Sequence, residues 1–584
     1  MQATWDLSVY YKGFDDPAFT RDIQSIKELA EHGAEQFKAS KSTQEALESI
    51  ITQTERLSDL LDLAYGYVQL TLSTEAENPT ALRWADELSG LMVGVQLFGS
   101  QCVRYVGAVE ALEDEIAKSE LLQKNAFALR EYAERAAHML PEDMEQWMLR
   151  MSLDGGDAFS KLRDRLMSTH MVALDGKMLP LPAVRGKAYD PDAAVRKAAY
   201  EAELASYKKV ETPMAFCLAC IKGEALTLCK AKGYPDILTE QLEESRMDRA
   251  TLDAMLTAIR EALPDFRRYL RLKAEALGHQ NGLPFYDLFA PIGAADQRYT
   301  VEEAHALLVK VFNDVNPEMA RFIDHAFESR WIDLFPKEGK EGGAFCAGSH
   351  ALKLSRVLTN FVGSFSDVST LAHELGHAWH NRCLEHMPVL LTDAPMPLAE
   401  TASIFNETLL SHIVRKTADA KTNFCLLENS LMEATQTVVD IYSRYLFETA
   451  VFEARKTHIP TADELNAMML EAQEAAYGDG LDPDVRHAGM WINKSHYYNV
   501  DLHFYNFPYA FGLLFGLGVF KRYLEQGSAF MPAYDALLAS CGCGKVADVA
   551  ASVGIDVRSV DYWRSALDVV RADVADFEKL CGKH

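Results

Sequence analysis

The chain has 584 residues, of which 48% are apolar, so it is long enough to bury a large hydrophobic core. It carries 58 lysines and arginines against 85 aspartates and glutamates, which gives a formal net charge of −27. This balance argues against nucleic acid or an anionic membrane surface as a partner, because phosphate binding needs clustered cationic side chains.

The N-terminal segment does not read as a secretory signal, and no apolar run approaches the about 20 residues of a membrane span. We therefore expect a cytoplasmic protein that does not bind membranes. The ten cysteines are scattered and are expected to be reduced, mostly buried thiols. Cys217 and Cys220 form a C-x-x-C pair, which is typical of redox or zinc sites. No second ligand pair follows at zinc-finger spacing, so core thiols are the preferred interpretation.

Most of the chain has the pattern of helices. Apolar residues recur every three or four positions over 16–70 and again over 77–135, which indicates the helices of a bundle. The period breaks around 178–184, where two prolines indicate a loop or a short strand. Helical patterns resume near residue 190 and continue, with connections, to about residue 328.

Strand character is confined to residues 330–365. A glycine-rich loop leads into the runs AFCAG and LKLSRVLTNF, whose β-prone residues are bounded by turn formers. We expect a small sheet here, which either offers an edge strand to an extended peptide or is only a packing hairpin. For a peptide-binding edge, Gly343, Ala344 and Phe345 are the candidate substrate contacts.

The segment from Asp367 to Cys383 reads DVSTLAHELGHAWHNRC and is predicted to be a helix. Asp367 or Ser366 can cap its N-terminus, and no proline interrupts it. Gly376 lies inside this helix, where a glycine costs about 1 kcal/mol relative to alanine. We therefore expect a packing reason for the glycine.

The same segment contains an H-E-x-x-H motif. On a helix, His373 and His377 lie about one turn apart on one face, so both rings can bind one Zn²⁺ ion. Glu374 would then lie beside the metal, where it can take a proton from water. The alternative is a helix with two satisfied surface histidines, because short motifs also occur by chance.

A catalytic zinc site needs a third protein ligand and one open position. The extended motif with Gly at 380 and His at 383 is excluded, because the chain has His380 and Cys383. Glu400, which lies 23 residues after His377, is the candidate from the following helix. Glu407 lies two turns further on the same face and is a candidate partner for a ligand histidine. The alternative for Glu400 is an ordinary glutamate in the first turn of a helix.

Four segments of the chain resemble oligoendopeptidase F, within the thimet oligopeptidase group of zinc metallopeptidases. They are DVSTLAHELGHAWH at 367–380, LAETASIFNE at 398–407, GKEGGAFC at 339–346 and SHYYNVDLHFYNFPYAFG at 495–512. The stretches WDLSVYY and DPDAAVRKAAYEAE are also similar to this family, so the resemblance runs nearly end to end.

The resemblance implies a mainly α, two-lobed helical zincin peptidase, with a small β-sheet beside the active-site helix and a deep internal channel. It implies an N-terminal helical domain over 1–115 and a peptidase domain over 116–584, with the sheet at about 330–365 and the zinc helix at 367–383. One zinc ion per chain would be bound by His373, His377 and Glu400. Glu374 would be the catalytic base.

By the same resemblance, the C-terminal aromatic segment contributes to catalysis. His496 and Tyr505 are similar to the residues with which this family binds substrate and stabilises the reacting carbonyl, and Tyr509 or Tyr498 would share that role. One donor to a developing oxyanion is worth about 3–4 kcal/mol, and a tyrosine hydroxyl or histidine N–H can supply it. Without the zinc motif, the segment would read as aromatic core packing. We expect His503 and His380 to be structural.

These observations predict a zinc-dependent endopeptidase that hydrolyses internal bonds of short, unstructured oligopeptides. One alternative is an exopeptidase of the peptidyl-dipeptidase or carboxypeptidase type. An alternative of another class is a helical peptide-binding protein that holds a structural zinc or none. Cleavage preference and oligomeric state are not predicted.

Overall fold

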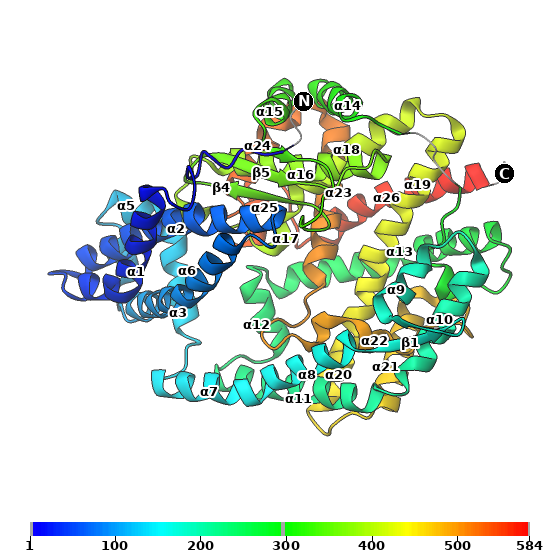
Figure 1. Ribbon diagram of the computed structural model, residues 1–584, viewed down its shortest axis with the longest axis horizontal. Coiled ribbons are helices and arrows are strands. Elements are labelled where there is room, and N and C mark those ends of the chain that lie inside the picture. The colour runs from blue at the N-terminus through cyan, green and yellow to red at the C-terminus, as the bar shows by residue number, and fades with distance from the viewer. Residues whose placement is uncertain (1–3, 294–297, 582–584) are drawn as a thin grey trace. The chain divides into compact units, whose positions relative to one another are not determined.

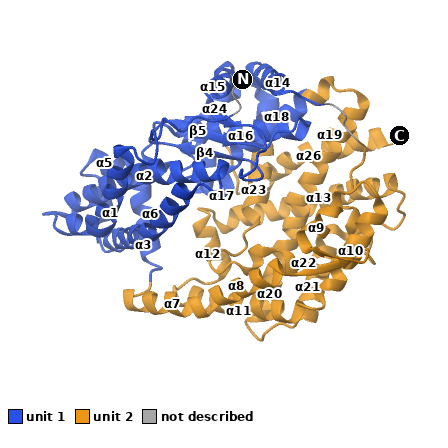
Figure 2. Ribbon diagram, viewed as in Figure 1, with its two compact units in different colours: residues 1–139, 297–413, 522–554 blue, residues 140–296, 414–521, 555–584 orange. Residues whose placement is uncertain are grey.

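A computed structural model describes residues 4–293 and 298–581 of the chain. The chain forms two compact units, each assembled from three separate segments (Figure 2). Unit 1 contains residues 1–139, 297–413 and 522–554, and unit 2 contains residues 140–296, 414–521 and 555–584. Both units are mainly helical, which confirms the predicted fold class (Figure 1). Within the described residues, no helix has both the length and the apolar composition needed to cross a bilayer.

The two units divide the chain at other places than the predicted boundary near residue 115. Residues 298–413 belong to the same unit as the N-terminal helices. As a statement about domains, the division into 1–115 and 116–584 stays a prediction. The internal channel concerns the arrangement of the units and also stays a prediction.

The N-terminal part of unit 1 is a helical bundle in which α1 packs on α2 and α3, and α3 packs on α6. The predicted three-to-four spacing of apolar residues becomes the buried face of these helices, with Phe19, Ile26 and Ile50 fully buried. The helices are α1 (Pro17–Lys38), α2 (Thr43–Thr74), α3 (Pro79–Gly107), α4 (Leu112–Ile116), α5 (Glu120–Lys124) and α6 (Ala126–Ala136).

The rest of unit 1 surrounds a three-stranded sheet. Its elements are α14 (Val301–Asn313), α15 (Pro317–Glu328), β3 (Ile332–Asp333), β4 (Phe345–Ser349), β5 (Leu354–Leu358), α16 (Phe365–Leu384), α17 (Met396–Ala399), α18 (Thr401–Thr417) up to residue 413, α24 (Met531–Ser540) and α25 (Val546–Ser552). The strand order is β3-β5-β4, with β3 parallel and β4 antiparallel to β5. The sheet predicted at 330–365 is therefore present. Helix α16 packs against both β4 and β5.

Unit 2 is built around the long helix α13, which packs against α26. Its elements are α7 (Glu142–Asp154), α8 (Gly156–Ser168), β1 (Met171–Leu174), β2 (Lys177–Pro180), α9 (Leu181–Arg185), α10 (Ala193–Tyr207), α11 (Glu211–Ala231), α12 (Ile237–Glu244), α13 (Arg249–Ala276), α19 (Ala420–Thr435), α20 (Ile441–Arg455), α21 (Ala462–Tyr477), α22 (Met490–Asn493), α23 (Phe507–Gln526) up to residue 521, and α26 (Val560–Cys581). A π-helical turn, Gln436–Asp440, joins α19 to α20. Cys217 is fully buried in the core of this unit, and burial raises the pKa of its thiol to about 11, as expected of a core cysteine.

Candidate metal centre

The helix that carries the H-E-x-x-H motif begins earlier than its sequence indicated. The N-cap is Ser364, so the prediction of Asp367 or Ser366 at that position was wrong. The Ser364 hydroxyl accepts a hydrogen bond from the Asp367 N–H at 3.1 Å, and the Asp367 carboxylate accepts one from the Ser364 N–H at 2.8 Å. This reciprocal pair is a capping box, for which the S-x-x-D spacing of 364–367 was the available signal. It fixes the start of α16 two turns before His373.

The two histidines of the motif converge with Glu400 on one point. The Nε2 atoms of His373 and His377 lie 3.3 and 3.4 Å from Glu400 Oε2. A tetrahedral zinc ion with bonds of about 2.0–2.1 Å holds its ligand atoms about 3.3–3.4 Å apart, so these donors fit the ion. In the described part of the chain, this is the one group of three or more His, Cys, Asp or Glu side chains with metal-binding geometry.

Glu400 lies at the junction of α17 and α18, not within the first turn of a single helix. Its carboxylate is held by Ser403, whose hydroxyl donates to Glu400 Oε2 at 2.7 Å. The Ser403 hydroxyl is also 2.9 Å from the Glu400 carbonyl. Ser403 therefore orients the carboxylate, a role that nothing in the sequence pattern indicated.

Glu407 is the partner of His373, as its spacing predicted. Glu407 Oε2 lies 3.3 Å from His373 Nδ1, and Glu407 Oε1 accepts a hydrogen bond from the Ser369 hydroxyl at 3.1 Å. With its Nδ1–H directed at Glu407, the ring presents a lone pair on Nε2, which is the form that binds a metal. A hydrogen bond of 3.2 Å from Asn406 Nδ2 in α18 to the Ala372 carbonyl in α16 joins the two helices that carry Glu407 and His373.

The glycine within α16 lies directly against the backbone of α18. A Cβ atom on Gly376 would lie 2.6 Å from the Ala402 carbonyl oxygen and 2.7 Å from Ser403 Cα. The packing reason predicted for this glycine is therefore confirmed. The contact also sets the distance between the histidine helix and the segment that carries Glu400.

The charges of the cluster favour a cation. Burial opposes a charged imidazole at His373, yet hydrogen bonds to Glu400 and Glu407 raise its pKa to about 10. Burial likewise disfavours the charge of Glu400, but the histidines hold its pKa below the usual range. The carboxylates thus attract positive charge to this point, which a divalent ion supplies. Glu374 is 6% exposed, and burial raises the pKa of its carboxyl.

Replacing Glu407 by Gln is expected to weaken metal binding by about 10–100-fold, because the charged acceptor of the His373 N–H is lost. Competition with a chromophoric chelator measures the affinity. Ser369→Ala is the matched control: it removes only the second hydrogen bond to Glu407 and should weaken binding by less than the Glu407 change. An unaltered metal affinity in Glu407→Gln would show that the contact does not orient the histidine.

The strand beside the metal helix has an open edge. Among the described strands, β4 pairs only with β5, so its other side carries unpaired backbone groups. Gly343, with φ of +83°, ends the preceding loop, and Asn360 Nδ2 donates to its carbonyl at 2.9 Å. Ala344 is half-buried, and the ring of Phe345 packs against Trp5 with centroids 6.2 Å apart. The backbone of these residues, more than the Phe345 ring, is available to a ligand.

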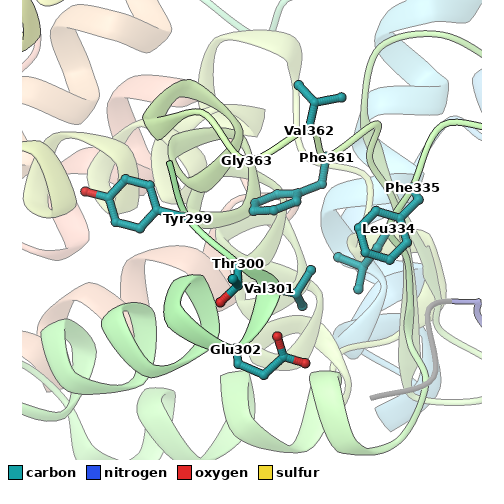
Figure 3. A pocket seen from close by; sticks show the side chains of 9 residues that line it. All are labelled: Tyr299, Thr300, Val301, Glu302, Leu334, Phe335, Phe361, Val362 and Gly363. Atoms are coloured by element: carbon teal, nitrogen blue, oxygen red, sulfur yellow. The ribbon is translucent and has the colours of Figure 1, made fainter. Parts of the chain in front are cut away.

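A groove of about 340 Å³ lies at the loop before α16 (Figure 3). Tyr299, Phe335, Phe361, Val362 and Gly363 contribute to its walls, which contain one carboxylate, Glu302, among the described lining residues. The groove contains none of the metal-binding side chains.

Three of the C-terminal candidates gather in unit 2. The His496 ring lies over that of Tyr505 with centroids 6.1 Å apart, and the hydroxyls of Tyr505 and Tyr509 form a hydrogen bond. Burial, with Arg444 and Lys494 nearby, lowers the pKa of His496 to about 2, so its ring is neutral. Its Nε2 has no hydrogen-bond partner among the described residues.

The backbone just before Tyr505 is strained. Phe504 has φ of +50°, a conformation that bulky residues rarely adopt. Such strain persists only where the surroundings impose it, and it is common at functional sites. The sequence gives no sign of it.

Tyr498 differs from these three residues. It is 1% exposed in the core of unit 2, and the Arg163 guanidinium lies 5.4 Å from its ring centroid. In this structure it packs and does not reach the surface. His503 and His380 are also buried, as expected of structural residues: His503 Nδ1 lies 3.1 Å from Lys222 Nζ, and His380 Nε2 lies 3.2 Å from the Leu538 carbonyl.

Comparisons of the sequence and of the fold with known proteins agree with one another. A sequence model described as peptidase family M3 matches residues 187–569, more than half of the chain. An oligoendopeptidase F homolog of Lactococcus lactis subsp. lactis is 24% identical over 99% of this chain and 97% of its own length. A candidate peptidase from Chlamydophila abortus has the same fold, with a TM-score of 0.87 at 20% identity over 99% of this chain and 98% of its own. The structure of oligoendopeptidase F from Enterococcus faecium is also similar, with a TM-score of 0.69 at 17% identity. The match covers 98% of this chain and 100% of that one.

Proposed function

The chain belongs to peptidase family M3, and on this basis we propose that it is a zinc-dependent endopeptidase that cleaves internal bonds of short peptides. Its relatives include proteins named oligoendopeptidase F and oligopeptidase PepF. The observation that carries the proposal is the convergence of His373, His377 and Glu400 beside the buried carboxylate of Glu374.

The metal would be held by His373 Nε2, His377 Nε2 and Glu400 Oε2. When bound, zinc supplies Lewis acidity that polarises the scissile carbonyl and makes water a stronger acid. The Glu374 carboxylate takes the proton from the attacking water and gives it to the leaving nitrogen. Its position supports this role, because Glu374 is buried next to the ligand His373, where it can reach water in the site.

His496, Tyr505 and Tyr509 are proposed to donate hydrogen bonds to the carbonyl oxygen as charge develops on it. The neutral ring and unpartnered Nε2 of His496 support this, because such an N–H has no competing acceptor within the described residues. The paired tyrosine hydroxyls offer a second donor. Tyr498 is left out of this group, since its side chain is enclosed in the core.

The substrate is proposed to bind as an extended chain along the open edge of β4, next to Gly343 and Ala344. The support is the unpaired backbone of this strand and its contact with α16. An extended backbone can be bound in this way only where the peptide is unfolded, which agrees with short, unstructured peptides as substrates. The predicted cytoplasmic location stays a prediction.

The experiment is cleavage of quenched fluorescent peptides, each made with a free and an amidated C-terminus, with products identified by mass spectrometry. We expect internal cleavage of both forms, loss of activity on chelation, and recovery when zinc is restored. Cleavage restricted to free C-termini would instead support the exopeptidase alternative. Binding without cleavage would support the non-catalytic peptide-binding alternative.

A further inference from the structure

Unit 2 contains a cavity of about 390 Å³ that the proposed peptidase chemistry does not use. Its walls come from α9 and the 3₁₀ turn after it, α10, the loop at 285–289, the π-helical turn Gln436–Asp440 and the segment 487–494. Ligand pockets typically measure about 300–1,000 Å³, so this volume suits a ligand of the size of one amino-acid derivative. π-Helical turns are rare and occur frequently at functional sites.

The cations in and beside the cavity are paired with carboxylates, with one exception. Arg185 Nη1 lies 2.8 Å from Glu203 Oε1, and Arg196 Nε lies 2.7 Å from Asp287 Oδ1. Asp440 is likewise paired, with the guanidinium of Arg444.

The exception is Lys494, which also lines the cavity. No described residue forms a hydrogen bond or a close ion pair with its ammonium, although the carboxylates of Asp440 and Glu203 lie near enough to favour its charge. Burial, together with Arg444 close by, lowers the pKa of Lys494 to about 8. A partly buried ammonium without a hydrogen-bonded acceptor is costly, and an anionic ligand group in contact with it would relieve that cost.

The remaining walls are aromatic. Tyr189 and Phe289 lie with ring centroids 5.1 Å apart, and Tyr200 lies 5.8 Å from Tyr286. These rings offer apolar area to the body of a ligand. His487, in the same wall, is 2% exposed, and its Nδ1 has no hydrogen-bond partner within the described residues.

The carboxylates limit which anion can enter. Glu203 and Asp440 both line the cavity, so a doubly charged group such as a phosphate would meet two like charges there. A singly charged carboxylate needs only the one unpaired ammonium. The combination of one ammonium without a hydrogen-bonded acceptor and aromatic walls is therefore suited to an apolar monocarboxylate.

We propose that this cavity binds a small monocarboxylate with an aromatic or aliphatic body, its carboxylate on Lys494 and its body between the Tyr189–Phe289 and Tyr200–Tyr286 pairs. An N-acylated hydrophobic amino acid has this chemistry. The site lies wholly within unit 2 and shares no residue with the metal cluster. The proposal therefore does not depend on the zinc chemistry.

The test uses N-acetyl-4-bromo-L-phenylalanine and its carboxamide on the metal-loaded full-length protein. In crystals, the anomalous signal of bromine is expected in the cavity for the acid, with the carboxylate in contact with Lys494. By calorimetry, the acid should bind about 10–100-fold more tightly at this site than the amide, the size of one charge-assisted hydrogen bond. A bromine signal found only elsewhere, or equal binding of acid and amide, would overturn the proposal.

Lys494→Met should lower the affinity for the acid to that of the amide, and Lys494→Arg should keep the preference for the acid. Lys456→Met is the matched control, because Lys456 is an exposed lysine of the same unit, and it should bind both probes as the unaltered protein does. Unchanged binding of the acid in Lys494→Met would also refute the proposal. If that variant does not fold, the acid and amide comparison and the bromine position still decide the question.

Discussion

Replacing Glu374 by Gln is expected to lower kcat/KM by about 10²–10⁴-fold while metal remains bound at the same stoichiometry. Glutamine has nearly the shape of glutamate but cannot accept and return a proton, so the change removes general-base catalysis, whose usual contribution is of this size. His373, His377 and Glu400 are untouched, and their donors keep the geometry that holds the ion. Hydrolysis of a quenched fluorescent peptide and elemental analysis measure the two quantities.

Glu385→Gln is the matched control for this change. Glu385 follows the last residue of the same helix and pairs with Arg382, away from the histidine face. The Glu385→Gln variant should retain both the bound metal and the peptidase activity. Full activity in Glu374→Gln would reject the proposed mechanism, and loss of metal from that variant would mean that Glu374 acts as a ligand.

Gly376→Val is expected to reduce metal affinity and activity together. The added Cβ would fall within 2.7 Å of the backbone at Ala402 and Ser403. Backbone cannot move aside as a side chain can, so α18 must shift relative to α16 and carry Glu400 away from the histidines. Overpacking of this kind costs about 1–3 kcal/mol of stability. Thermal unfolding of the metal-free protein and chelator competition of the folded variant measure both effects.

A control on another helix separates this contact from helix propensity. Gly90 lies within α3, and nothing lies within 4 Å of a Cβ built there. Gly90→Ala should therefore leave metal binding unchanged and raise stability by a few tenths to about 1 kcal/mol. If Gly376→Val retained full metal affinity, the close approach of α18 would not determine the site.

The parts of the site that could be predicted are those set by local spacing. The separation of His373 and His377 by four residues puts them on one helical face in any helix, and Glu407 follows Glu400 by a fixed rotation. The β-prone runs at 330–365 were recognised for the same reason, because alternation and turn residues are local properties. The glycine at 376 was also informative, because a residue that weakens a helix indicates a contact that needs it.

Other features depend on contacts between distant residues. Glu400 lies at a helix junction held by Ser403, which depends on how α17 meets α18. Tyr498 is buried because helices distant in the sequence pack around it in the core of unit 2. The aromatic segment at 495–512 does not by itself show which of its tyrosines is buried. The positive φ of Phe504 is imposed by its surroundings.

The short strand allowed at 178–184 overlaps β2, but its pairing with β1 in a hairpin was not predicted, although it had a local signal. The hairpin β1–β2 turns at Asp175 and Gly176, which have φ of 51° and 74°. An Asp-Gly pair between two short apolar runs is a strong indication of a two-residue hairpin turn.

The central claim is that one metal ion is bound by two imidazoles of α16 and the carboxylate at the start of α18. The most direct test is a crystal structure recorded above and below the zinc absorption edge. We expect one anomalous peak per chain, within about 2.0–2.2 Å of His373 Nε2, His377 Nε2 and a Glu400 oxygen, and no fourth protein ligand. A peak at another place, a fourth protein ligand, or full peptidase activity in protein shown to be free of metal would contradict the account.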